Sequence, residues 1–197
     1  MKQKINPILV QEKLREKHIK IFTPEEFSRI FSVSLTQTKY FLETYARKGF
    51  LTRLKKGLYV LKNQFPSEEE IANVLYRPSY ISFEYVLARH GIIPEMVYAV
   101  TSATAKSTRH FSVNEKEFPY YTIKKSAFAG FYLVKEGDKS FLVAEPEKAL
   151  ADYLYFVSLG KRSLNERINI RNLKKEKIIR YAKMFKKPKI LDLLEKL

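Results

Sequence analysis

The chain has 197 residues, of which 45% are hydrophobic and 14% aromatic, a composition typical of a folded protein with one large or two small domains. It contains no cysteine, which excludes disulfides, thiolate zinc sites and cysteine nucleophiles. The formal net charge of +16 is unevenly placed, since residues 1–61 carry a net +8, residues 62–160 a net −1 and residues 161–197 a net +9. Two basic ends around a near-neutral middle favour a polyanionic partner such as nucleic acid.

Two helices are predicted in the first thirty residues. The stretch NPILVQEKLREKH (6–18) begins with a capping asparagine and a proline, and Ile8, Leu9 and Leu14 are expected to share its apolar face. The stretch TPEEFSRIF (23–31) begins with a capping threonine, followed by two glutamates that complement the positive end of the helix dipole.

A third helix, LTQTKYFLETYARKG (35–49), is predicted to be amphipathic and to stop at Gly49, which suits a left-handed C-cap. Its apolar side is expected to consist of Leu35, Leu42, Tyr45 and Ala46. Its polar side is expected to consist of Thr36, Gln37, Tyr40, Thr44 and Arg47.

A β-hairpin follows in GFLTRLKKGLYVL (49–61), with strands at 51–54 and 58–61 and Gly57 in the loop. Its tip carries Lys55 and Lys56, preceded by Arg53, although a tip that only reverses the chain does not need three positive charges. The order helix, helix, turn, helix, hairpin is that of a winged helix-turn-helix. In such folds the third helix enters the major groove and the hairpin tip contacts phosphates.

Residues 1–62 are therefore predicted to form a winged helix-turn-helix domain that binds double-stranded DNA. The residues expected to contact DNA are Ser34, Thr36, Gln37, Lys39, Tyr40, Thr44, Arg47, Arg53, Lys55 and Lys56. Winged helices also serve as protein–protein modules, so the reading of these side chains as ordinary solvated positions stays open.

Residues 63–197 are predicted to form an α+β domain with a mostly antiparallel sheet, joined to the first domain by the polar stretch 62–70. Helices are predicted from Ser67, over 79–91 with a cap near Ser79 or Ser82, and over 145–160. Strands are predicted at 96–102, 118–123, 128–134 and 140–144. Residues 160–197 form a basic tail with two helical pieces, 172–185 and 188–197.

Five segments together carry a family resemblance: LKKGLYVL (54–61), SYISFEYVLARHGIIPE (79–95), a Thr/Ser-rich stretch (101–109), FAGF (128–131) and AEPEKALADYLYF (144–156). In this order they resemble the AbiEi family of antitoxins and transcriptional regulators of bacterial abortive-infection systems. The resemblance implies a winged-helix domain that represses its own operon and an α+β domain that counteracts a nucleotidyltransferase-type toxin. In such type IV systems a stable complex with the toxin is not required.

A second nucleic-acid contact is considered at two places. Lys106 and Arg109 lie in TSATAKSTRH (101–110), where hydroxyls and cations suit a phosphate backbone, although an exposed polar strand is the favoured interpretation. Lys174, Lys175 and Lys177 lie in the basic tail, where a solvated helix face is an equal alternative.

No catalytic, metal or cofactor site is predicted, because none of His18, His90 and His110 has a partner at ligand spacing and the three aspartates are dispersed. Glu84 and Glu95 bracket His90 but are expected on a helix surface. Together with these observations, the resemblance to the AbiEi family implies a cytoplasmic, non-enzymatic antitoxin without a membrane segment. The alternatives are a stand-alone transcription factor whose body senses a ligand or partner, and a nucleic-acid-processing enzyme or its accessory subunit.

Overall fold

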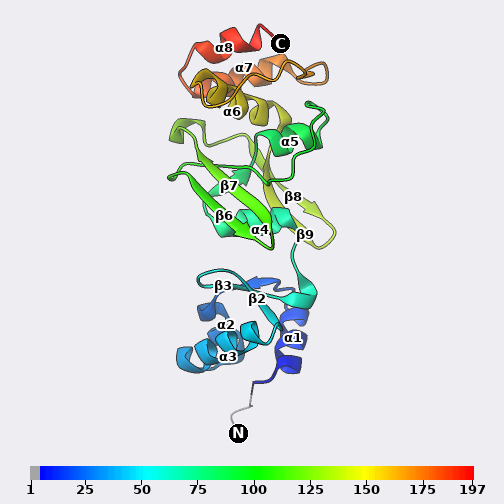
Figure 1. The fold of residues 1–197 in the computed structure, drawn as a ribbon, viewed down its shortest axis with the longest axis vertical. Helices are drawn as coiled ribbons and strands as arrows, with labels where there is room; N and C mark the ends of the chain where they lie inside the picture. Colours follow the sequence, from blue (N-terminus) through cyan, green and yellow to red (C-terminus); the bar gives the residue numbers. More distant parts are fainter. Residues whose placement is uncertain (1–4) are drawn as a thin grey trace. The chain divides into compact units, whose positions relative to one another are not determined.

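The chain forms a mixed α+β structure in two compact units, residues 1–67 and 68–197, in a computed structural model that describes residues 5–197 (Figure 1). The division lies within the polar stretch 62–70, a few residues beyond the boundary predicted at residue 62. Within the described residues, no helix has both the length and the apolar character needed to cross a bilayer. The first four residues of the predicted N-terminal domain lie outside the described part of the chain.

The N-terminal unit consists of three helices and a small antiparallel sheet. Its elements are α1 (Pro7–Glu16), β1 (Ile21–Phe22), α2 (Pro24–Phe31), α3 (Leu35–Arg47), β2 (Leu51–Lys55), β3 (Leu58–Leu61) and the 3₁₀ turn η1 (Lys62–Gln64). The strand order is β1-β3-β2. Strand β1, which sequence reasoning missed because it is only two residues long, pairs with β3 and closes the sheet on one side.

Local signals in the sequence set where the helices of this unit begin. Asn6 caps α1 by accepting the backbone N–H of Leu9. In α2, Thr23 and Glu26 form a reciprocal capping box, in which each side chain accepts the other's backbone N–H. These caps satisfy donors that have no partner inside a helix, so each start is specified by two or three residues.

The core of the N-terminal unit is aromatic and apolar. The buried faces of α1 and α3 differ from the predicted ones. In α1 the buried side chains are Val10 and Leu14, one turn apart, whereas Ile8 is 70% exposed and Leu9 is only partly buried. In α3 the buried stripe runs through Thr38, Phe41 and Leu42. Leu35 lies at the edge of this stripe in the first turn, where it is 57% exposed.

The C-terminal unit combines one six-stranded sheet with five helices. Its strands are β4 (Ser79–Ile81), β5 (Ser102–Thr104), β6 (Arg109–Val113), β7 (Lys116–Thr122), β8 (Phe131–Glu136) and β9 (Lys139–Ala144). Its helices are α4 (Glu68–Leu75), α5 (Glu84–Arg89), α6 (Pro146–Ser158), α7 (Lys175–Met184) and α8 (Lys189–Leu194), with the 3₁₀ turn η2 (Lys125–Ala127). The strand order is β6-β7-β5-β4-β9-β8.

The sheet is mixed. Three strand pairs are antiparallel and two, β4 with β9 and β5 with β7, are parallel. The prediction of a mostly antiparallel sheet is thus confirmed, with one parallel pair on each side of the central antiparallel pair β5–β4. The predicted turn at Gly137 and Asp138 joins β8 to β9.

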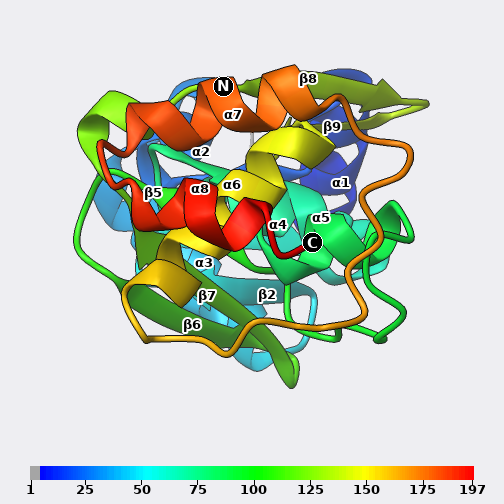
Figure 2. The same cartoon turned by 90° about the horizontal axis from the view of Figure 1, so that it is seen from above.

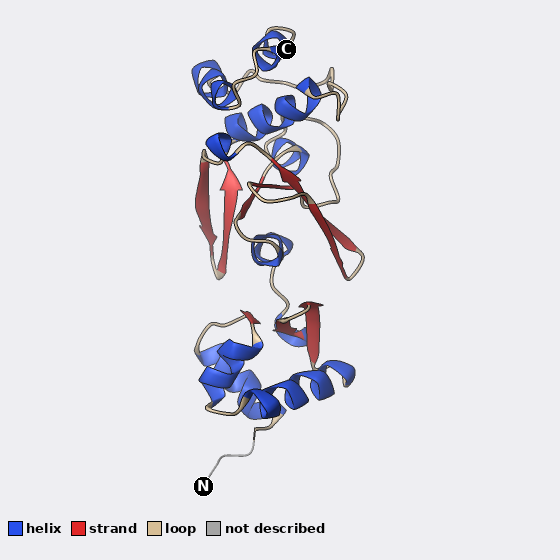
Figure 3. Cartoon of the chain, turned by 90° about the vertical axis from the view of Figure 1, so that its left-hand side faces the viewer, coloured by secondary structure: helices blue, strands red, loops and turns tan. Residues whose placement is uncertain are grey.

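Helix α6 is the central helix of this unit. Eleven of its 13 residues are buried, including the charged residues Glu147, Lys148 and Asp152. It contacts β9 on one side and α5, α7 and α8 on others. Figure 2 shows α7 and α8 lying against α6, and in Figure 3 the strands of the unit form a layer with α6 above it. The basic tail is therefore docked through its apolar faces, as predicted.

Two predictions for this unit are wrong. The predicted helix 79–91 is a strand followed by a short helix, because Ser79–Ile81 is buried between β5 and β9, where aromatic and β-branched side chains favour a strand. Neither serine caps the helix, since its N-cap is Phe83, with a φ of 60°. The predicted strand 96–102 is irregular until Ser102, and its side chains at Met96 and Tyr98 are exposed rather than packed.

Two other boundaries also moved. In the Thr/Ser-rich stretch 101–110, Ser102–Thr104 forms strand β5, residues 105–108 are irregular, and β6 begins only at Arg109. The interpretation of this stretch as an exposed polar strand is wrong for β5, which is buried because it pairs with β4 on one side and β7 on the other, and it holds only for Arg109 and His110. The strand predicted over 128–134 begins at Phe131 instead, after Gly130 with a φ of 77°.

Candidate nucleic-acid interface

Helix α3 presents its polar side to solvent. Ser34, Thr36, Gln37, Lys39, Tyr40 and Arg47 are exposed, and Thr44 is half-buried. Tyr40 is the most prominent of these, at 74% exposed. The exposed side therefore combines hydroxyls, a large ring and two cations, which are the side-chain types that contact phosphates and base edges.

Two of these residues are also committed to building the helix start. Ser34 is the N-cap of α3 and accepts the backbone N–H of Gln37 at 3.2 Å. In return, Gln37 Oε1 accepts the backbone N–H of Ser34 at 3.2 Å and its hydroxyl at 3.2 Å. Since the amide oxygen of Gln37 is occupied within its own helix, Thr36 and Tyr40 are the better-placed side chains of the first two turns for contacting a ligand.

The hairpin tip is shaped by a bulge. The register of β2 against β3 shifts between Arg53 and Lys55, and Gly57 adopts a φ of 76° that favours glycine. The Arg53 side chain is exposed, and its Nε donates to the backbone oxygen of Lys55 at 3.4 Å. Lys56 is exposed, whereas Lys55 is half-buried.

A shared core fixes the hairpin relative to α3. Phe41 and Leu42 of the helix pack in one cluster with Leu51, Tyr59 and Leu61 of the hairpin. The Phe41 ring lies 5.3 Å from that of Phe27 in α2, between centroids. The exposed side of α3 and the basic tip are consequently held by one rigid core.

The second predicted contact, at 101–110, is partly engaged in the fold. Lys106 Nζ donates to the backbone oxygen of Arg77 at 2.5 Å and lies 5.6 Å from the centre of the Tyr76 ring. Arg109 is exposed at the start of the edge strand β6. Lys106 is therefore engaged by a backbone oxygen of the fold, and the exposed Arg109 is the more available of the two side chains for a phosphate.

The three tail lysines have different surroundings. Lys177 Nζ donates to Glu145 Oε2 at 2.7 Å, and this hydrogen bond lowers the pKa of Glu145 and raises that of Lys177. The backbone N–H of Lys174 donates to Glu147 Oε1 at 3.2 Å, while its side chain and that of Lys175 are exposed. Lys177 thus docks α7 onto the start of α6. Of the three lysines, Lys174 and Lys175 are the ones whose ammonium groups are exposed to solvent.

A buried polar network in the C-terminal unit escaped sequence reasoning. Lys148 and Asp152 are both 0% exposed and form an ion pair through Asp152 Oδ1. The hydroxyls of Tyr80 and Ser82 donate to Asp152 Oδ2 at 3.0 and 2.7 Å. The Lys148 ammonium also lies 4.7 Å from the centre of the ring of Phe185, the residue that ends α7 in the tail.

Burial governs the titration of this network. It lowers the pKa of Lys148 and raises that of Asp152, while their mutual attraction opposes both shifts. Burial and the neighbouring Asp152 raise the pKa of Tyr80. With every member closed off from solvent, the network stabilises the packing of α6 against β4. The only sequence signal for it was a lysine and an aspartate one turn apart in an otherwise apolar helix.

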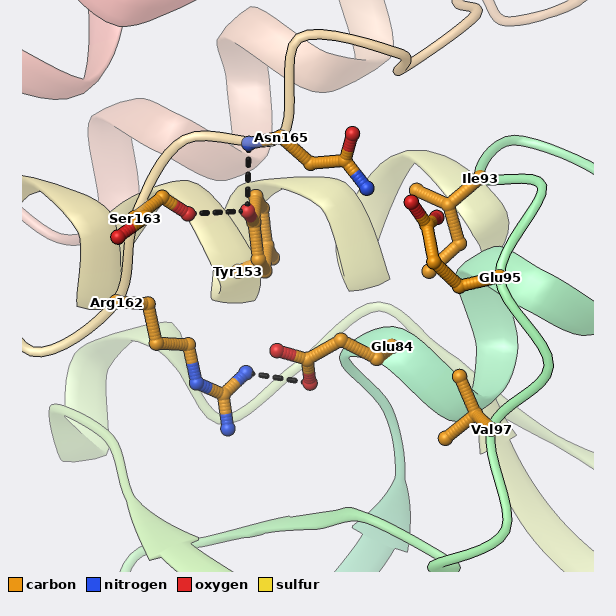
Figure 4. A pocket seen from close by; sticks show the side chains of 8 residues that line it. All are labelled: Glu84, Ile93, Glu95, Val97, Tyr153, Arg162, Ser163 and Asn165. Atoms are coloured by element: carbon orange, nitrogen blue, oxygen red, sulfur yellow. Dashed lines mark hydrogen bonds and ion pairs between the residues drawn. The ribbon is translucent and has the colours of Figure 1, made fainter.

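The C-terminal unit also contains a pocket of 340 Å³ (Figure 4). It is lined by Glu84, Ile93, Glu95, Val97, Tyr153, Arg162, Ser163 and Asn165. Glu84 pairs with Arg162, which also lines the pocket, and Glu95 pairs with Arg167. His90 does not line the pocket, and its pKa is lowered by partial burial and by Arg89. Within residues 5–197, no three His, Asp or Glu side chains converge in a way that suits a metal ion.

No model of a protein family matches the chain, and no curated protein matches its sequence.

Proposed function

We propose that residues 1–67 act as a winged helix-turn-helix that binds double-stranded DNA. In this proposal α2 and α3 form the helix-turn-helix, α3 enters the major groove and the β2–β3 tip contacts the adjacent phosphates. The observation that carries the proposal is the exposed polar and cationic side of α3 held in one core with a basic hairpin tip. The net charge of +8 over residues 1–61 supports it, because a duplex is a dense polyanion.

The proposed biological role is that of an antitoxin in a bacterial abortive-infection system, part of phage defence. The chain would bind operator DNA and repress its own operon in the cytoplasm, and its C-terminal unit would counteract a nucleotidyltransferase-type toxin. The support is the resemblance of residues 54–61, 79–95, 101–109, 128–131 and 144–156 to AbiEi proteins. The closed Lys148–Asp152 network fits a non-enzymatic body, since its polar groups are used in packing.

The DNA proposal is tested by titrating a labelled duplex from the region upstream of the chain's own gene with the full-length protein. We expect specific binding that is lost on shuffling the duplex sequence. Tyr40→Ala is expected to weaken binding to the specific duplex by about tenfold, since a base contact is worth ~1–3 kcal/mol. Equal affinity for the specific and shuffled duplexes, in the wild-type protein, would contradict the proposed operator binding.

The antitoxin role predicts a nucleotidyltransferase-like reading frame beside the gene, and it is tested by co-expressing the product of that reading frame with the chain. The variant carrying Lys55→Ala and Lys56→Ala is expected to lose repression of a reporter but to retain rescue of growth. Loss of rescue only on changes in the C-terminal unit assigns neutralisation to that unit. If the wild-type chain represses the reporter and never rescues growth, a stand-alone transcription factor remains, and the pocket at Glu84 and Glu95 is the observation that favours that second candidate.

A further inference from the structure

The end of helix α7 brings together lysines from two segments of the chain. The segment 183–189 (KMFKKPK) contains four lysines and no acidic residue, and the segment 124–126 (KKS) contains two more. Helices α7 and α8 form an outer layer on α6, on the side away from the sheet (Figure 1). Five of the six lysines are exposed and Lys187 is half-buried. Together they form a lysine cluster that consists of Lys124, Lys125, Lys183, Lys186, Lys187 and Lys189.

Two hydrogen bonds hold the segment 124–126 against the end of α7. Lys124 Nζ donates to the backbone oxygen of Phe185 at 2.6 Å, and Ser126 Oγ donates to that of Met184 at 3.0 Å. Carbonyls at the end of a helix have no partner inside it, and a positive charge is favoured there. Lys125 lies between the two anchoring residues and is exposed, so it belongs to the same surface as the lysines that end α7.

The lysine cluster differs from the other cations of the C-terminal unit in having no carboxylate partner. Lys177 pairs with Glu145 at 2.7 Å, and Arg162 pairs with Glu84 at 2.6 Å. Within residues 5–197, by contrast, no member of the lysine cluster forms an ion pair with an acidic side chain. Neighbouring like charges repel one another, so an anionic partner that neutralises them is stabilised at this surface.

One member of the cluster occupies a backbone conformation that favours glycine. Lys186 follows the end of α7 with a φ of 48°, in the left-handed region. Glycine or asparagine is usual at this position, because a longer side chain is strained there. The attraction of a lysine to the helix dipole offsets only part of that strain. The local fold therefore favours glycine, and the lysine side chain points to a role outside the fold.

The surroundings of the cluster favour a nucleic acid over a protein or a membrane as the partner. Protein interfaces are enriched in aromatic residues and depleted in lysine, whereas DNA interfaces are strongly positive. A helix that enters a membrane surface needs an exposed apolar face, but the apolar side of α7 is packed in the fold. The exposed large apolar side chains of the described part of the unit all lie outside the two segments: Met96, Tyr98, Tyr132, Leu133 and Leu159.

The cluster is also suited to phosphates and not to bases. Proteins that bind single strands stack the bases on exposed aromatic rings. The two segments contain one aromatic residue, Phe185, and it is fully buried. Lysines alone act as point charges that contact the phosphates of a duplex without reading its sequence.

We propose that the lysine cluster binds the phosphate backbone of double-stranded DNA without sequence preference. This contact goes beyond operator binding by α3 and the hairpin tip, and it lies wholly within the C-terminal unit. It also differs from the tail contact predicted at Lys174, Lys175 and Lys177, since none of these residues belongs to the cluster.

The test measures the affinity of the full-length protein for a duplex of shuffled sequence over a range of salt concentrations. The variant carrying Lys183→Ala and Lys186→Gly is expected to lower the slope of log K against log salt concentration by about 2, since each phosphate contact contributes ~0.9. The charge-matched control carries Lys135→Ala and Lys139→Ala, two exposed changes in the β8–β9 hairpin, and should leave the slope unchanged.

Lys186→Gly alone separates binding from folding. Because glycine removes the strain at a positive φ, the variant should resist urea at least as well as the wild-type protein, while its salt slope falls by about 1. A merely structural lysine would give the opposite pattern, with an unchanged slope.

The two proposed DNA contacts can fail independently. If only the cluster binds, its variant lowers the slope and the variant carrying Lys55→Ala and Lys56→Ala does not; if only the hairpin tip binds, the reverse holds. Polyglutamate and vesicles of anionic lipid serve as other polyanions. An unchanged slope in the cluster variant, an equal fall in its control, or equal losses of affinity for all three polyanions would each overturn the proposal.

Discussion

Among the described residues, the core of the N-terminal unit contains one buried polar side chain, Thr38, whereas the core of the C-terminal unit contains Glu147, Lys148 and Asp152. The first unit keeps its charges on the surface, at α3 and the hairpin tip. The second unit uses several of its charges in contacts between elements, buried ones to join α6 to β4 and partly exposed ones to join α7 to α6.

This difference indicates which residues are available for a partner. A surface charge contributes little to stability, so it can be selected for binding. A buried ion pair requires nearly complete hydrogen bonding, and removing one member leaves the other uncompensated. Changes at the exposed charges of α3 and the hairpin tip should therefore affect binding, and changes at the buried charges of α6 should affect stability.

The largest effect is expected for Lys148→Met, which leaves Asp152 buried without its cation. We expect the free energy of unfolding of the C-terminal unit to fall by ~3–5 kcal/mol. Native-state hydrogen exchange of the α6 amides measures this loss in the intact chain.

The control for this change is Lys183→Met, which removes an exposed lysine of α7 and is expected to cost less than ~0.5 kcal/mol. The double variant Lys148→Met, Asp152→Leu should be less destabilised than the sum of its single changes, because it removes both charges. Similar losses for Lys148→Met and Lys183→Met would show that the network does not hold the unit together.

A smaller effect is expected at Gly130, which separates the 3₁₀ turn η2 from β8. A Cβ at this position would lie 2.5 Å from Cε1 of Tyr181, whereas a Cβ at Gly160 meets no atom within 4 Å. Both glycines have a positive φ, so Gly130→Ala and Gly160→Ala share the backbone cost of ~1–2 kcal/mol. Gly130→Ala should cost a further ~1–3 kcal/mol from the clash with the tail. If the two variants lose the same free energy of unfolding in urea, a Cβ at position 130 does not clash with Tyr181 of α7.

The smallest expected effect is the pH dependence that arises from Glu145. Its folded-state pKa lies below the ordinary value of 4.5, so its contribution to stability is present above pH 4.5 and is lost as the pH falls through the folded-state pKa. Glu145→Gln should remove this part of the acid sensitivity of α7 docking, measured by hydrogen exchange between pH 6 and ~3. Glu176→Gln, an exposed change on α7, should leave it intact. A profile that is the same in all three proteins would contradict this role.

Sequence reasoning succeeded where structure is set locally. The starts of α1, α2, α4 and α6 and the β2–β3 and β8–β9 hairpins follow from caps, prolines and turn glycines, which act over a few residues. The segment 79–91 could not be assigned in this way, because Tyr80 forms a strand only when β5 and β9 lie on either side of it. Tertiary pairing of this kind overrides local propensity.

The candidate sites show the same limit. The exposed polar residues of α3 could be predicted from helical periodicity, since one turn repeats every 3.6 residues. The role of Gln37 in the cap does have a sequence signature, a serine three residues before a glutamine, which sequence reasoning overlooked. In contrast, the engagement of Lys106 and Lys177 and the approach of Glu84 and Glu95 to one pocket depend on partners up to 78 residues away in the chain, as for Glu84 and Arg162. No sequence spacing reports such contacts.

The most direct test of DNA binding by the N-terminal unit is the salt dependence of the affinity of the full-length protein for its upstream duplex. Two charge-matched variants are compared, Lys55→Ala with Lys56→Ala at the tip of the β2–β3 hairpin, and Lys135→Ala with Lys139→Ala in the β8–β9 hairpin. If the first tip contacts phosphates, its variant lowers the slope of log K against log salt concentration by about 2, while the second variant leaves the slope unchanged. Equal slopes for the two variants would contradict the account.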